Sequence, residues 1–175
     1  MDLVDDLFTH AVRLAANGEN QGTEQIDFRR AVSAAYYAVF HLLTMTAAES
    51  WTVGRERLRF ARLFEHGKLR SAFLALPAKL KDRLGSNASP NDQTTADTLA
   101  AVAKEFVALQ QDRNSADYDN SRVWSYTEVE DVITRAHELY LRWNTAIAVT
   151  LTAPRPGCRF VLGVEAYPEG IPFGG

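Results

Sequence analysis

The segment from Glu24 to Glu49 constrains the fold most, because apolar residues surround its middle on every side of a helix. Residues 31–40 read Ala-Val-Ser-Ala-Ala-Tyr-Tyr-Ala-Val-Phe. A helix that is hydrophobic all round is buried on several sides, and its alanines let neighbouring helices approach closely. The pattern therefore predicts the central helix of a helical bundle.

Apolar residues at helical spacing also occur before and after this segment. A first helix is predicted over about residues 3–16, ended by Asn17-Gly18, because these residues tolerate the left-handed turn after a helix. A third helical region is predicted over about residues 55–84, with breaks near Gly67 and Pro77.

Two more helices are predicted to begin near Thr94 and Ser125, the first of them after a polar loop over residues 85–93. Asp97 and Glu128 stand three residues after these starts, as in a capping box. The apolar stripes of the two helices comprise Leu99, Val102, Phe106 and Leu109, and Val129, Val132, Ala136, Leu139, Trp143 and Ala146.

These elements predict an all-α protein, an up-and-down bundle of four or five helices over residues 1–153. Tyr37 and Phe40 are expected in the centre of the bundle. Residues 154–175 are rich in Pro and Gly. They are expected to form an irregular tail, strand-like near residues 159–164, and no separate domain. Strands and helices do not alternate, which disfavours a doubly wound α/β fold.

The composition fits one globular domain of an intracellular protein. Of the 175 residues 46% are apolar, enough for a sizeable core, and the single Cys158 excludes a disulfide framework and a Cys-built zinc site. No run of about 18 apolar residues occurs, and the acidic Asp2, Asp5 and Asp6 do not suit a secretory signal. We expect a cytoplasmic location and no membrane contact.

The charge is unevenly distributed along the chain. The net charge is −3, yet residues 55–83 carry nine basic and three acidic side chains. Such a basic stretch attracts a phosphate backbone. The alternative is a solvated helix face with scattered counter-charges.

Familiar catalytic motifs are missing from the sequence. It has no glycine-rich phosphate loop, no G-x-S-x-G elbow and no H-E-x-x-H. No two of the histidines are spaced for a zinc site on one helix face; they are His10, His41, His66 and His137. We therefore expect neither a metal nor a cofactor.

Arg113 is the most informative single residue, because it extends the apolar stripe of the fourth predicted helix beyond Leu109. A guanidinium on an inward face needs a partner, and Asp117 lies one turn further on. One interpretation is a helix-end ion pair that anchors the following loop. The other is a fixed cation presented to a phosphate.

Two histidines likewise allow both a structural and a functional interpretation. His41 is either a histidine at the edge of the core or part of a site, and His66 is either a surface or capping residue or part of a site. Tyr36 and Tyr37 are expected to be core aromatics with one polar tip.

Three segments together resemble the HEPN family (higher eukaryotes and prokaryotes nucleotide-binding). They are Ala35-Tyr36-Tyr37-Ala38-Val39-Phe40-His41, then His66 with Phe73 seven residues later, and Arg113-Asn114-Ser115-Ala116-Asp117-Tyr118. Their order and spacing agree over about residues 1–150. The resemblance is to the branch of small stand-alone bacterial and archaeal proteins.

The resemblance implies a four- or five-helix bundle that forms a homodimer. Many members are metal-independent endoribonucleases with an Arg followed after four to six residues by a His. Arg113 and Asn114 match the start of that motif, but Tyr118 stands at the His position, and a phenol is a weak base at neutral pH. The implied catalytic residues are Arg113 and Tyr118. The implied RNA- or nucleotide-binding residues are Arg113, Asn114, Asp117, His41, His66 and Lys68.

Three functions follow from this resemblance. The first is a non-catalytic or weakly catalytic module that binds RNA or a nucleotide, as a possible toxin–antitoxin component. The second is a metal-independent endoribonuclease toxin whose base is Tyr118, His41 or His66. The third is an interaction subunit for a separate minimal nucleotidyltransferase, since family members are often paired with one.

Overall fold

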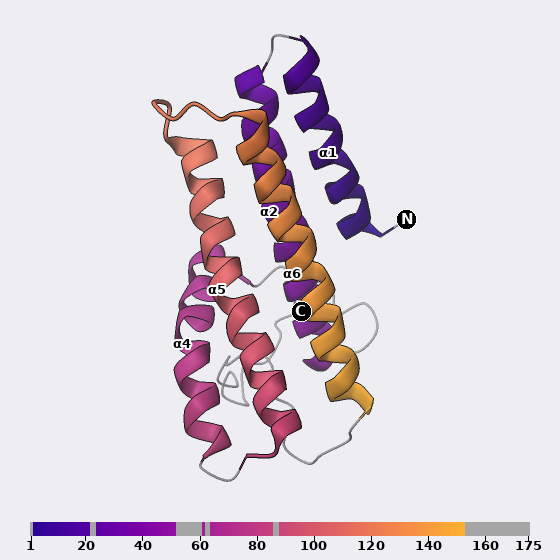
Figure 1. Cartoon of the computed structure of the whole chain (residues 1–175), viewed down its shortest axis with the longest axis vertical. Coiled ribbons are helices and arrows are strands. Elements are labelled where there is room, and N and C mark those ends of the chain that lie inside the picture. Colours follow the sequence, from indigo (N-terminus) through magenta and orange to yellow (C-terminus); the bar gives the residue numbers. More distant parts are fainter. Residues whose placement is uncertain (1, 22–23, 52–60, 62–63, 86–87, 153–175) are drawn as a thin grey trace, which may run out of the picture.

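Five α-helices make up most of the described chain, and no strand occurs among its residues. The computed structural model describes residues 2–21, 24–51, 61, 64–85 and 88–152. The helices are α1 (Leu3–Gln21), α2 (Glu24–Trp51), α4 (His66–Leu84), α5 (Pro90–Tyr118) and α6 (Tyr126–Thr152) (Figure 1). The all-α prediction is confirmed. The predicted tail, with its strand-like stretch and Cys158, lies outside the described residues.

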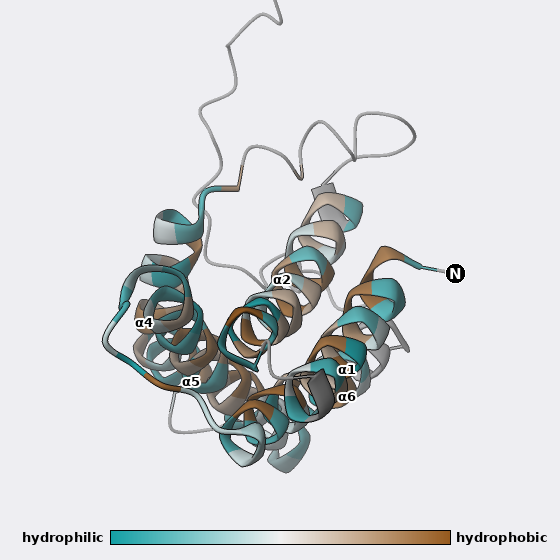
Figure 2. Cartoon of the chain, turned by 90° about the horizontal axis from the view of Figure 1, so that it is seen from above, coloured by the Kyte–Doolittle hydropathy of each residue, from teal (hydrophilic) through white to brown (hydrophobic). Residues whose placement is uncertain are grey.

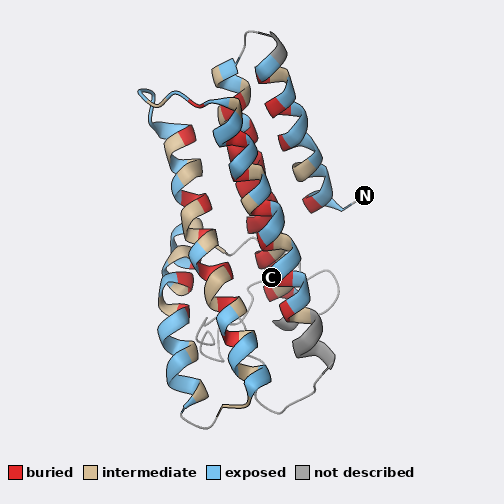
Figure 3. Ribbon diagram, viewed as in Figure 1, coloured by how far each residue is buried: buried red, intermediate tan, exposed pale blue. Residues whose placement is uncertain are grey.

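Helix α2 is the centre of the bundle, as its apolar run predicts. It packs against α1, α5 and α6, whereas α4 packs against α5. Buried residues run along α2 (Figure 3), and the hydrophobic sides of the helices face one another (Figure 2). The apolar stripes predicted for α5 and α6 are buried throughout.

Length and composition alone would allow α2 to cross a membrane over Glu24–Glu49. However, 67% of its most apolar window is buried inside the bundle. This burial is what the core helix of a bundle requires, since such a helix passes the same test of length and hydropathy.

Tyr36, rather than Tyr37, is the tyrosine in the core. Tyr36 and Phe40 are 0% and 7% exposed, whereas Tyr37 is only half-buried. Successive residues are turned by about 100° around a helix. Tyr36 therefore faces Phe106 of α5, with ring centroids 5.7 Å apart. The prediction is correct for Phe40 and wrong for Tyr37.

Helix α1 does not end at Asn17-Gly18 but continues to Gln21. Gly18 is buried, and a Cβ atom there would lie 2.5 Å from the Phe28 ring. The glycine therefore allows α1 and α2 to approach closely, and the sequence-based interpretation of it as a helix end was wrong.

Helix α5 starts at Pro90, four residues before the predicted Thr94. The Ser89 hydroxyl accepts a hydrogen bond from the backbone N–H of Asp92 at 3.2 Å, and Pro90 occupies the first turn. Ser before Pro is a strong start signal. The sequence pattern did not predict this start because residues 85–93 contain no large apolar residue.

The break predicted near Gly67 is confirmed, because residues 64 and 65 are not helical and α4 begins at His66. The break at Pro77 is wrong, since α4 runs through it. Burial of Leu69, Phe73 and Leu76 offsets the hydrogen bond that proline cannot donate. Residues 55–60, 62 and 63 of this predicted region lie outside the described residues.

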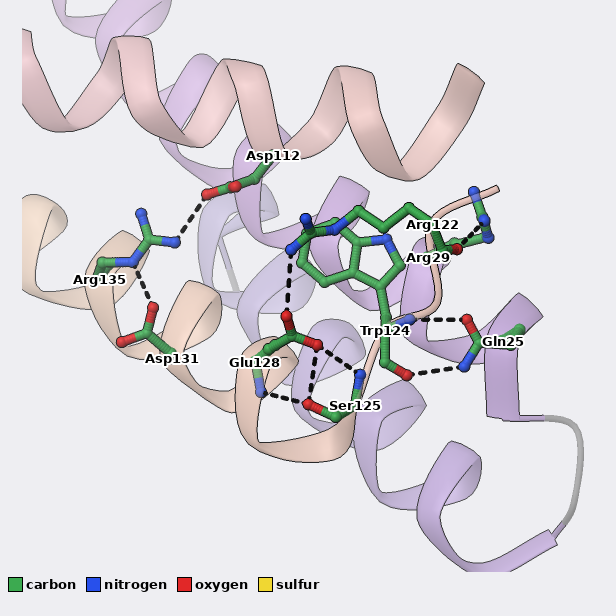
Figure 4. A network of polar contacts seen from close by, with 9 residues as sticks. All are labelled: Gln25, Arg29, Asp112, Arg122, Trp124, Ser125, Glu128, Asp131 and Arg135. Carbon is green, nitrogen blue, oxygen red and sulfur yellow. Dashed lines mark hydrogen bonds and ion pairs between the residues drawn. The ribbon is translucent and has the colours of Figure 1, made fainter. Parts of the chain in front are cut away.

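Helix α6 begins as predicted. The Ser125 backbone N–H donates to Glu128 Oε2 at 2.9 Å, and the Glu128 N–H donates to the Ser125 hydroxyl at 3.3 Å. This is the reciprocal capping box, and Figure 4 shows both side chains at the helix start.

Candidate functional site

Arg113 lies at the inner edge of the last turns of α5, with its side chain 16% exposed. Its Nε is 2.7 Å from Asp117 Oδ2, which is the predicted i, i+4 ion pair. Nη2 donates to the Tyr37 hydroxyl of α2 at 2.9 Å, and Nη1 donates to Asn114 Oδ1 at 3.2 Å. The guanidinium is thus fixed in one orientation by three side chains.

Two tyrosine rings lie close to this cation. The guanidinium carbon is 5.6 Å from the ring centroid of Tyr37 and 5.4 Å from that of Tyr118. Both distances suit a cation–π interaction. Tyr118 is 73% exposed, so its ring adds a flat aromatic surface beside the charge.

Asp117 is held from a second side. Its Oδ1 accepts a hydrogen bond from the Ser33 hydroxyl of α2 at 2.6 Å. Because both carboxylate oxygens have partners, Asp117 connects the end of α5 to α2 and keeps Arg113 in place.

His66 opens α4 and faces the same region. Its Nδ1 is 2.8 Å from the Tyr36 hydroxyl, and its ring lies 4.1 Å from the Phe40 ring. The side-chain amide of Gln110 donates to the His66 carbonyl at 3.1 Å. Burial, followed by the nearby Arg113 charge and His41, lowers the pKa of His66 below its ordinary value.

His41 is the second imidazole of the cluster. Its ring centroid is 5.8 Å from that of Phe40 and 6.4 Å from that of Tyr37. Burial lowers the pKa of His41. Both imidazoles are therefore neutral near pH 7, and Arg113 is the permanent cation of the cluster.

Six of the seven predicted site residues share this region, and they are Arg113, Asn114, Asp117, Tyr118, His41 and His66. Lys68 instead forms an ion pair with Glu65 at 2.8 Å, and both side chains are about two-thirds exposed. Sequence reasoning missed two residues, Ser33 and Gln110. Ser33 was a polar interruption in an apolar run, and Gln110 stood beside Leu109 in the stripe of α5.

A second polar network holds the turn after α5 (Figure 4). Arg29 of α2 donates to the carbonyls of Ala116, Asp119 and Arg122 at 2.7, 2.9 and 2.6 Å. Gln25 exchanges two hydrogen bonds with the Trp124 backbone, at 2.7 and 2.9 Å. The end of α5 that carries the candidate site is therefore anchored to α2.

Among the described residues, no group of three or more His, Cys, Asp or Glu side chains is arranged to hold a metal ion. A cavity of about 430 Å³ lies between α4 and α5, lined by residues that include Pro77, Leu80 and Ala96. No residue of the Arg113 cluster lines it.

Comparison with known proteins gives no match to a family model, a curated protein or a solved structure.

Proposed function

We propose that the chain is a HEPN-like module that binds RNA or a nucleotide at Arg113, with little or no catalysis of its own. The observation that carries this proposal is the fixed guanidinium. Nη2 and Nη1 each donate one of the five N–H groups, to Tyr37 and Asn114, Nε forms the ion pair with Asp117, and one more contact reaches Tyr118. At least one donor remains for a phosphate oxygen, which suits the planar fork of arginine.

The surroundings of Arg113 favour binding over a purely structural ion pair. A helix-end pair with Asp117 needs no further polar groups. Here two imidazoles, His41 and His66, and the exposed aromatic ring of Tyr118 lie around the same cation. An exposed ring beside a cation is a typical platform for an unpaired base.

The test is binding of a short single-stranded RNA, measured by fluorescence anisotropy at two salt concentrations. Arg113→Ala should lower the affinity for RNA about tenfold or more, because it removes a hydrogen bond between two charged groups. Binding to the parent should weaken as salt rises. Arg142→Ala is the matched control, because Arg142 forms an i, i+4 pair with Glu138 on α6. Equal affinity in all three proteins refutes the proposal.

A metal-independent endoribonuclease is the second candidate, favoured by the neutral His66 imidazole near Arg113. In that case His66, in place of Tyr118, takes the proton of the ribose 2′-hydroxyl, whose oxygen bonds to the neighbouring phosphorus while the bond from phosphorus to the 5′-oxygen breaks. The leaving 5′-oxygen takes a proton from water, and Arg113 stabilises the negative charge on the non-bridging phosphate oxygens. Incubation with a mixed RNA pool in EDTA tests it. Cleavage that is lost in both Arg113→Ala and His66→Gln supports an enzyme, and intact RNA with the parent excludes it.

The proposed assembly is a cytoplasmic homodimer that brings two copies of Arg113 toward one cleft. Val123, 73% exposed in the loop after α5, is apolar surface that a two-fold contact covers, leaving Tyr118 open to the ligand. Light scattering at micromolar concentration should give the mass of a dimer.

A separate nucleotidyltransferase is a further proposed partner, tested by co-purification with the product of a neighbouring gene.

A further inference from the structure

Helix α4 is strongly basic, and it starts at the candidate site. Its 19 residues include five Lys or Arg and a single Asp, although the whole chain has a net charge of −3. The helix lies at the edge of the bundle (Figure 1), and among the described helices it packs against α5 alone. The ring of its first residue, His66, has its centroid 5.7 Å from that of Tyr37, whose hydroxyl binds Arg113. A ligand held by Arg113 therefore lies at the start of a basic helix.

Two of the five cations lie on the same face of α4 as His66. Successive residues of a helix turn by about 100° and rise by about 1.5 Å. Arg70 and Lys81 therefore lie within about 60° of His66 around the helix, and Lys81 is about 22 Å from it along the axis. Arg70 is half-buried and Lys81 is exposed, and neither forms an ion pair among the described residues.

The carboxylates of the neighbouring helix do not neutralise this face. Glu105 and Asp112 of α5 bind Arg135 of α6, at 2.8 and 2.7 Å. Asp97 lines the same cavity as Lys81, but no ion pair joins the two. The face of α4 that begins at His66 therefore keeps a net positive charge, and an anion with charges at several points along the helix is the partner that fits it.

We propose that the ligand is a single RNA strand rather than a free nucleotide, and that it runs from Arg113 along this face of α4 to Lys81. This inference rests on the proposed function. A free nucleotide has its phosphates at one point, whereas a strand carries one charge on every nucleotide. With its bases stacked as in a duplex, a strand rises about 3.4 Å per nucleotide, so the distance from His66 to Lys81 takes about seven nucleotides. Because these contacts reach phosphates, they are independent of the base sequence.

The first test measures affinity against length, with uridine oligomers from one to about twelve nucleotides. Affinity should rise with length up to about seven nucleotides and then level off. Each neutralised phosphate of a single strand contributes about −0.7 to the slope of log affinity against log salt. Three contacts should give the heptamer a slope of about −2, and one contact should give uridine monophosphate a slope of about −0.7. Equal affinity and equal slope for both overturn the strand proposal and leave Arg113 as a nucleotide site.

The second test removes the two cations on α4. Arg70→Gln/Lys81→Gln should lower the affinity for the heptamer about tenfold at low salt and change that for uridine monophosphate by about twofold or less. Arg13→Gln/Arg142→Gln is the matched control, because it removes the same charge from exposed positions on α1 and α6, which do not pack against α4. The control should bind like the parent.

Two outcomes of the second test overturn the strand proposal alone. The first is equal affinity of the two double variants for the heptamer. The second is competition by a poly-glutamate peptide of the same charge that is as strong as competition by the heptamer, since the face is then a general anion surface. If neither uridine monophosphate nor the heptamer binds the parent, the proposed function is refuted as well.

Discussion

Replacement of Asp117 by Asn should tighten phosphate binding while it lowers stability, and these opposite signs make it the sharpest test of the site. The carboxylate lies 2.7 Å from the Arg113 guanidinium, so it neutralises the cation that we assign to the ligand. Asn has a side-chain oxygen that still accepts the hydrogen bond from the Ser33 hydroxyl, which is 2.6 Å long in the parent protein. The substitution therefore removes the negative charge and leaves the contact between α5 and α2.

The size of the effect follows from the charges. A phosphate held by Arg113 would lie roughly 6 Å from the Asp117 carboxylate. At that distance two like charges repel by about 0.7 kcal/mol in water and about 3 kcal/mol at an effective dielectric constant of about 20. Because the Asp117 side chain is 28% exposed, we expect about 1 kcal/mol, or about fivefold tighter binding at low salt. The lost ion pair should cost about 1 kcal/mol or less of unfolding free energy.

The assay is anisotropy with the same RNA, together with urea unfolding of each protein. Asp131→Asn is the matched control, because Asp131 pairs with Arg135 at 2.7 Å on α6 and its loss changes the net charge equally. The control should leave affinity nearly unchanged. If Asp117→Asn binds RNA no better than Asp131→Asn does, the phosphate does not lie on Arg113 and the reasoning is refuted.

Gly18→Ala should destabilise the protein, because a Cβ 2.5 Å from the Phe28 ring costs about 1–3 kcal/mol of overpacking against about 1 kcal/mol gained in helix propensity. Gly67→Ala should stabilise it, since nothing lies within 4 Å of that Cβ; urea unfolding that gives both variants the same sign contradicts the packing argument. The lowered pKa of His66 means that the unfolded chain binds more protons below about pH 6.5, so unfolding free energy should fall as pH drops below that value. His66→Gln should flatten this pH dependence in urea titrations and leave the part due to His41; an unchanged slope would mean that folding does not perturb His66.

Local sequence signals predicted the helices well wherever they agreed with tertiary packing. The all-round apolar run of α2 and the Ser125–Glu128 capping box determine local structure and burial together. The predicted helix end at Gly18 was wrong because a glycine can either end a helix or leave room for a neighbouring side chain. The position of the Phe28 ring in the folded chain shows that the second role applies. The helix break predicted at Pro77 was wrong because burial of the apolar face of α4 outweighs the one hydrogen bond that proline cannot donate.

The candidate site was predictable in its charges but not in its geometry. The i, i+4 spacing of Arg113 and Asp117 is local, so the ion pair could be predicted from sequence alone. The hydrogen bond from Arg113 to Tyr37 spans 76 positions and the one from Gln110 to His66 spans 44. Such contacts depend on the register between packed helices, which periodicity does not specify. Gln110 consequently looked like an ordinary polar neighbour of the stripe.

Arg29 explains how an exposed helix end can carry a fixed site. The last carbonyls of a helix have no partner within it and carry partial negative charge. The Arg29 guanidinium binds the Ala116 carbonyl of that turn and two carbonyls of the loop beyond it. Ser33, one turn further along the same face of α2, holds Asp117. Helix α2 therefore fixes both the backbone and the carboxylate that orient Arg113, while Tyr118 beside them stays exposed to a ligand.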